Sequence, residues 1–178
     1  MKVMTYLSGA ILGLMTFSSV SASYDNGIAG KGRVRVFGSV IDSACAIDIG
    51  SRDQVIDMGT VPLSDIIRDG QGKNKSFTIK LINCVTKRIG KADWKQFRVT
   101  FDGTPDGDLF GVSGEASGVA LRIISADGSI ARPGEVMPPV DITSGSMELN
   151  YSLKLMANSH VLKAGSYSSS ISFKLDYF

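Results

Sequence analysis

The end of the sequence alternates between apolar and polar side chains up to its last residue. In the stretch ISFKLDYF the apolar members are Ile171, Phe173, Leu175 and Tyr177. A period of two predicts a β-strand with one buried face. No turn and no further strand follow it in this sequence, so we expect this strand to leave an edge of its sheet uncovered.

The same alternation recurs along most of the chain and is punctuated by Asp-Gly turns, which are typical of hairpins. Pro62 and Gly70 bracket the one segment with a helical pattern, residues 63–69. The remaining pattern favours an all-β fold, a sandwich of the immunoglobulin type. Besides the last strand, the expected strands are residues 33–41, 54–58, 76–84, 96–101, 118–124 and 147–156.

The first 22 residues are typical of a secretory signal peptide. Lys2 opens a short basic region, the stretch LSGAILGLMTF is mostly apolar, and Val20, Ser21 and Ala22 provide small residues for cleavage. The exported chain is then expected to begin at Ser23. No later apolar run approaches the roughly 20 residues of a membrane-spanning helix.

The two cysteines agree with export. Cys45 and Cys84 are the only cysteines, and an even count in an exported chain predicts a disulfide between them. His160 is the only histidine, which argues against a metal site and a Ser-His-Asp triad. We therefore expect no enzymatic activity, metal, cofactor or small-molecule substrate. The net charge of +2, without a block of like charges, argues against nucleic-acid binding.

A second alternation lies near the start of the expected exported chain, and every second position in it is apolar or glycine. Its members are Ile28, Gly30, Gly32, Val34 and Val36. This segment could be a flexible terminus that leads into the first strand. It could also be a strand that adds to the sheet of another molecule. Such an added strand would cover the open edge that the last strand leaves.

Together with the cysteines, both ends resemble those of a known family. The stretch GRVRVFGSVIDSACAID carries Cys45, FTIKLINC ends at Cys84, Gly165 is fourteenth from the end, and Tyr177 is the penultimate residue. In these features the sequence resembles the pilin subunits of chaperone–usher fimbriae, the P-pilus and type 1 group of Gram-negative bacteria. The combination is specific, although each feature alone would be weak.

The resemblance implies an immunoglobulin-like sandwich that lacks its last strand. A periplasmic chaperone would lend a strand to residues 166–178 and hold the carboxylate of Phe178. At the outer-membrane usher, the N-terminal extension of a neighbouring pilin would replace the chaperone strand. The implied divisions are a signal peptide (1–22), a donor extension (23–36) and a pilin domain (37–178). The implied donor residues are Ile28, Gly30, Gly32, Val34 and Val36. The implied chaperone- and subunit-binding residues are Gly165, Ile171, Phe173, Leu175, Tyr177 and Phe178.

The length of the segment before Cys45 bears on which kind of pilin subunit this chain is. About 22 residues lie between the expected cleavage site and Cys45, which leaves no space for a receptor-binding domain before the pilin domain. The loops at residues 106–117 and SADGSIARPGE favour a minor or adaptor pilin at the cell surface that supports adhesion. A major rod pilin, a terminator and a self-contained exported immunoglobulin-like binding module remain alternatives. An exported enzyme is the least favoured reading.

Overall fold

The computed structural model describes residues 32–178, so the predicted signal peptide lies outside the described residues. The chain divides into a first unit, Met1–Ser39, and a compact unit, Val40–Phe178. Residues 32–43 form neither helix nor strand, so the strand predicted at residues 33–41 is wrong for this structure. The side chains of Val34 and Val36 are 88% and 87% exposed. A strand needs a neighbour for its main-chain hydrogen bonds and its apolar face, and this segment has none in the described part of the chain.

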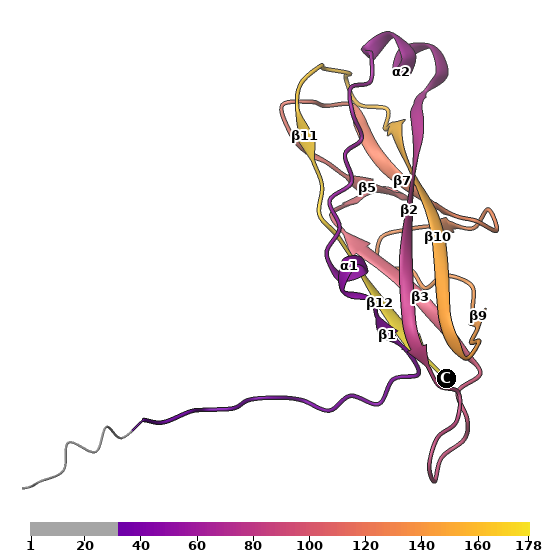
Figure 1. The fold of residues 1–178 in the computed structure, drawn as a ribbon. Coiled ribbons are helices and arrows are strands. Elements are labelled where there is room, and N and C mark those ends of the chain that lie inside the picture. The colour runs from indigo at the N-terminus through magenta and orange to yellow at the C-terminus, as the bar shows by residue number, and fades with distance from the viewer. Residues whose placement is uncertain (1–31) are drawn as a thin grey trace, which may run out of the picture. The chain divides into compact units, whose positions relative to one another are not determined.

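The larger sheet of the compact unit is antiparallel, and its strands lie in the order β1-β2-β10-β7-β5-β4, with β8 also paired to β7 (Figure 1). Its two longest strands, β2 and β10, pair with each other. The bounds are β1 Ala46–Ile47, β2 Gln71–Cys84, β4 Pro105–Asp106, β5 Leu109–Gly111, β7 Val119–Ser125, β8 Ile130–Ala131 and β10 Gly145–Ala157.

The second sheet has three strands in the order β12-β3-β9, which are β12 Ile171–Tyr177, β3 Gln96–Gly103 and β9 Val140–Asp141. A two-stranded ladder joins β6 (Ser113–Gly114) to β11 (Tyr167–Ser168). Within residues 32–178, β12 pairs with β3 on one side and with no strand on the other. The last strand of the sequence is therefore present where it was predicted, and it is an edge strand.

Aromatic side chains join the two sheets. The ring of Phe101 on β3 lies edge-on to Tyr151 on β10, with 5.0 Å between the centroids, and edge-on to Phe77 on β2 at 6.4 Å. Phe77 and Tyr151 stack on each other at 5.4 Å. Edge-to-face and stacked pairs at these distances are the favoured aromatic geometries. They form the centre of the core between the sheets.

Two short helices precede β2. α1 (Ile49–Arg52) is capped by the carboxylate of Asp48, which accepts a hydrogen bond from the amide of Gly50 at 3.0 Å. α2 (Leu63–Asp69) confirms the predicted helix and ends at Gly70, which has a φ of 67°. A left-handed residue at this position suits glycine. The strand predicted at residues 54–58 is wrong, because this segment forms no strand and pairs with none in the described part of the chain.

Candidate strand-binding groove

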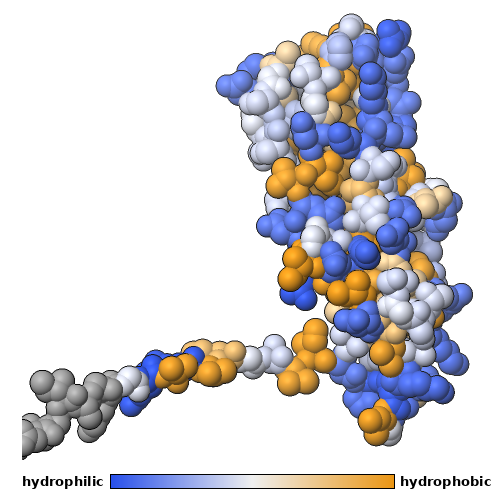
Figure 2. All heavy atoms as spheres, viewed as in Figure 1, coloured by the Kyte–Doolittle hydropathy of each residue, from blue (hydrophilic) through white to orange (hydrophobic). Residues whose placement is uncertain are grey.

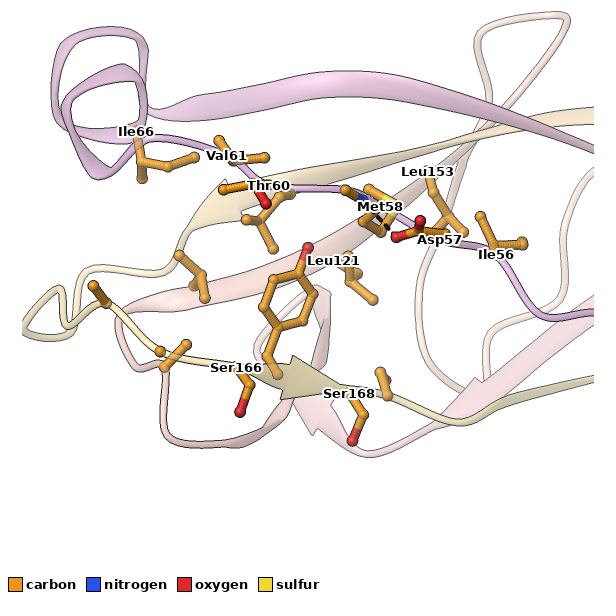
Figure 3. Close-up of a pocket in the computed structure, with 18 of the residues that line it drawn as sticks. Ile56, Asp57, Met58, Thr60, Val61, Ile66, Leu121, Leu153, Ser166 and Ser168 are labelled. Carbon is orange, nitrogen blue, oxygen red and sulfur yellow. Dashed lines mark hydrogen bonds between the residues drawn. The ribbon is translucent and has the colours of Figure 1, made fainter.

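A groove with a volume of about 730 Å³ lies between two segments that are far apart in the sequence and do not pair with each other. One wall is residues 54–61 and the other is residues 163–171. Within the described part of the chain, no hydrogen bond joins the two walls. Figure 3 shows Ile56, Met58 and Val61 along one wall, opposite Ser166 and Ser168.

The floor of the groove is apolar. It is formed by Val119 and Leu121 of β7 and by Leu153 and Leu155 of β10, and Ile66 of α2 also lines it. These side chains belong to the main hydrophobic core. The groove is therefore an opening in one side of the sandwich through which core side chains are reached.

The last strand borders the same opening. Its apolar residues, Phe173 and Leu175 among them, pack against the core but stay only partly buried. On the neighbouring strand β3, by contrast, Phe97 and Phe101 are 0% and 2% exposed. The alternation is the same on both strands, so the difference lies in what covers them. The inward face of β12 lacks a covering neighbour on its free edge.

Gly165 allows the second wall to pass close to the loop beside it. A Cβ atom on Gly165 would lie 2.6 Å from the Cβ of Glu115 and 2.8 Å from the amide nitrogen of Ala116. Atoms this close must shift, so any other residue would push the two segments apart. The amides of Glu115 and Ala116 donate to the carbonyl of Ser166 at 2.9 and 3.1 Å, which fixes this contact.

Tyr177 anchors the far end of β12 beside the disulfide. Its ring packs against Trp94 and Phe97, with centroids 5.9 and 5.8 Å away, and its hydroxyl donates to the carbonyl of Cys45 at 3.5 Å. Burial raises the pKa of the Tyr177 hydroxyl above its ordinary value, against an opposing effect of the hydrogen bond to Cys45. The predicted disulfide is present between Cys45 and Cys84.

Phe178 closes the strand. Its amide donates to the carbonyl of Gln96, and its own carbonyl accepts from the amides of Lys95 and Gln96 at 3.0 and 3.1 Å. The guanidinium of Arg98 lies over the Phe178 ring, 4.7 Å from the centroid. The terminal residue thus extends the pairing between β12 and β3.

The structure describes only part of the predicted donor segment. Ile28 and Gly30 lie outside the described residues, whereas Gly32, Val34 and Val36 are exposed members of the first unit. The six residues predicted at the other end, Gly165 to Phe178, all lie on or next to the second wall and β12. Their roles in binding stay predictions.

Sequence reasoning missed the opposite wall and the floor. Ile56 and Met58 alternate, and this pattern predicts a strand within the fold rather than the rim of a groove. Tyr167 was also missed, although it continues the odd-numbered alternation of β12 backwards to the groove. In residues 32–178 there is no group of three or more metal-ligating side chains, and no helix is long and apolar enough to cross a membrane.

The chain has clear relatives. The model of the fimbrial protein family matches residues 32–177. The PRS fimbrial minor pilin protein of Escherichia coli is 37% identical over 152 residues, which are 82% of this chain and 77% of the relative. The PAP fimbrial minor pilin protein of Escherichia coli is 36% identical over the same shares. The major MR/P fimbria protein of Proteus mirabilis is 26% identical and covers 93% of each chain.

Solved structures of pilus subunits also resemble this chain. The P pilus rod subunit PapA superposes with a TM-score of 0.68 at 25% identity, covering 76% of this chain and all of that one. A subunit in a structure of a chaperone–usher pilus gives a TM-score of 0.66 at 23% identity, covering 84% of this chain and 97% of that one, and so supports the fold. The mostly-β prediction is confirmed. The family is structural, in agreement with the prediction that the chain is not an enzyme. The chain belongs to the fimbrial protein family, whose members are subunits of the cell-surface fimbriae of Gram-negative bacteria.

Proposed function

We propose that this chain is a minor pilin that joins a chaperone–usher fimbria by accepting a strand in its groove and by donating its own N-terminal segment. The relatives named minor pilins, at 37% and 36% identity, support the class of subunit. The groove supports the mode of assembly. A periplasmic chaperone would fill the groove first, and a neighbouring pilin would replace it at the outer-membrane usher.

The observation that carries this proposal is the half-buried face of β12 next to an unpaired edge. An added strand would hydrogen-bond to that edge and cover Ile171, Phe173 and Leu175, which the chain itself leaves partly open. Strand addition of this kind takes its affinity from main-chain hydrogen bonds and its specificity from alternate side chains. Residues 54–61 would form the other border of the inserted strand.

The donor segment has the matching pattern. Val34 and Val36 are exposed, and each would contribute on the order of 1.5–3 kcal/mol if an apolar groove buried it fully. Arg33 and Arg35 alternate with them and would face solvent. In Figure 2 the stretch next to the grey spheres carries orange and blue spheres together, as this pattern of valine and arginine requires. Ile28, Gly30 and Gly32 would extend the inward row.

A binding experiment tests the proposal. A labelled synthetic peptide of residues 23–37 is titrated with the oxidised exported chain, whose groove stands in for the groove of a neighbouring pilin, and fluorescence anisotropy reports binding. We expect saturable binding that is weakened at least 100-fold when Val34 and Val36 are both replaced by Asp. The matched control peptide carries Arg33→Asp and Arg35→Asp and should stay within a few-fold. Equal binding of the two doubly substituted peptides would contradict insertion of the alternating face.

A further inference from the structure

The loop between β2 and β3, residues 85–95, projects from the compact unit and carries an apolar side chain at its tip. In Figure 1 this loop extends beyond the ends of the strands that it connects. Ile89 at the tip is fully exposed, and the next residue, Gly90, turns the chain with a φ of 70°. A single exposed isoleucine is ordinary on a protein surface. The argument for a contact therefore depends on how the loop holds Ile89 and on what comes within its reach.

The loop is braced by its own side chains. The amide of Trp94 donates to the carbonyl of Thr86 at 2.8 Å, which closes the loop. The carboxylate of Asp93 accepts from the ammonium of Lys87 at 2.9 Å and from the amide of Arg88 at 3.2 Å. The guanidinium of Arg88 lies over the Trp94 ring, 3.8 Å from the centroid, in a cation–π contact. A preformed projection of this kind loses little conformational entropy when it binds a partner.

The same loop holds the beginning of the compact unit. The carboxylate of Asp42 accepts from the guanidinium of Arg88 and, at 2.9 Å, from the ammonium of Lys91. Val36, the last residue of the proposed donor alternation, precedes Asp42 by six residues. Six fully extended residues span at most about 22 Å. A neighbouring pilin that takes up Val36 must therefore come within that distance of Asp42 and of the loop that is paired with it.

The charge of the loop indicates the chemistry of its partner. Residues 85–95 contain four cationic side chains and a single carboxylate, that of Asp93, so the loop stays positive even after Asp42 is added. Lys87 and Lys91, on either side of the tip, are exposed. We propose that residues 85–95 form a second docking surface on the pilin that accepts this chain's N-terminal segment, with Ile89 on an apolar patch that carboxylates border. This inference rests on the proposed function, which brings the accepting pilin within reach.

Photo-crosslinking in assembled fimbriae tests the contact. The photoreactive residue p-benzoylphenylalanine replaces Ile89, Val34 or Ile130 in the full chain, and mass spectrometry identifies the subunit that each position captures. Ile130 on β8 is the matched control, because it is also an exposed isoleucine. We expect Ile89 and Val34 to capture the same pilin and Ile130 to capture at least ten-fold less of it. If Val34 captures a pilin and Ile89 does not, the inference is overturned and the proposed function stands. If Val34 captures none, the proposed function itself fails.

The rate at which this subunit leaves isolated fimbriae in warm detergent tests the chemistry of the contact. Ile89→Asp should speed its release at least five-fold, whereas Ile130→Asp should release like wild type. The oxidised exported chain with Ile89→Asp should keep the urea midpoint of wild type, because Ile89 is fully exposed, and a merely structural role would lower that midpoint. Lys87→Glu should also speed release, since it brings a negative charge to the carboxylates of the partner. Unchanged release of Ile89→Asp would overturn the docking surface, and unchanged or slower release of Lys87→Glu would overturn the acidic border.

Discussion

The hydroxyl of Tyr177 lies 3.5 Å from the carbonyl oxygen of Cys45, so the penultimate residue reaches the cysteine that begins the folded core. The two residues are 132 positions apart in the sequence. This contact fixes one end of β12 next to the disulfide, while the other end continues to the groove. The open strand is thus held at one end by side-chain packing.

Replacing Tyr177 tests this anchor. We expect Tyr177→Ala to lower the free energy of unfolding by about 2–3 kcal/mol, because the ring that packs on Trp94 and Phe97 is lost. Tyr177→Phe removes only the long hydrogen bond and should cost about 0.5 kcal/mol. Urea unfolding followed by Trp94 fluorescence measures both. Equal losses for the two variants would show that the hydroxyl, rather than the ring, holds the strand.

Removing the disulfide should destabilise the domain strongly. The bond closes a loop with a sequence separation of 39 residues. In the chain-entropy model a loop of this size contributes roughly 4 kcal/mol. The double variant Cys45→Ala, Cys84→Ala is compared with the oxidised wild-type protein by urea unfolding. Both proteins are unfolded in the presence of the peptide of residues 23–37. A difference below about 1 kcal/mol would contradict this role.

Gly165→Ala should disturb the groove despite adding a single carbon. The new Cβ would collide with Glu115, so we expect a loss of about 2 kcal/mol and weaker binding of the donor peptide. Gly38→Ala is the matched control, because nothing lies within 4 Å of a Cβ at that position. Urea unfolding measures the loss of stability, and fluorescence anisotropy measures the binding of the donor peptide. Similar behaviour of both variants would indicate that the close approach at Gly165 is unimportant.

The alternation of β12 predicts opposite results for neighbouring residues. Leu175→Asn places a polar group on the partly buried face and should cost about 1–3 kcal/mol. Asp176→Asn, on the exposed face, should change stability by less than about 0.5 kcal/mol. The midpoints of denaturant unfolding of the two variants, compared with wild type, measure both changes in stability. A larger effect of Asp176→Asn would mean that the strand has the opposite orientation.

Stability should fall at high pH. Burial, with a smaller effect from the charge of Asp127, raises the pKa of Tyr151 from 10.0 to about 12. The folded state therefore retains a proton that the unfolded state loses first, so the contribution of Tyr151 to stability is constant below pH 10 and is lost between about pH 10 and 12. The difference corresponds to about 2–3 kcal/mol. Melting temperatures across this range should fall more steeply for wild type than for Tyr151→Phe.

The sequence predicts the strands that pair within one chain. Phe97 and Phe101 alternate on a strand with partners on both sides, and the structure buries them. Two other extended segments were predicted as strands but form no ladder. Residues 33–41 and 54–58 have the pattern of a strand and no partner among the described residues. Local periodicity reports the extended backbone, whereas pairing depends on what lies beside it.

The groove and the last strand show the same limit. Tyr177 and Gly165 could be singled out from the sequence because they lie at set distances from the last residue. Met58, Leu121 and Tyr167 come from three distant parts of the chain. They line one groove only because the tertiary fold brings these parts together. No pattern in the sequence marks a position as the floor of an opening, because the same residues would form an ordinary core if a further strand covered them.

Thermal unfolding of the dilute, oxidised exported chain, alone and with a saturating peptide of residues 23–37, tests the central claim most directly. Trp94 lies against Tyr177 on β12 and reports the transition. A chain that needs a further strand should unfold at a low temperature alone and gain about 10 °C with peptide at roughly 100 times its dissociation constant. A chain that on its own unfolds cooperatively at a high temperature, and is not shifted by the peptide, would contradict the claim that its sandwich is completed by a strand from another molecule.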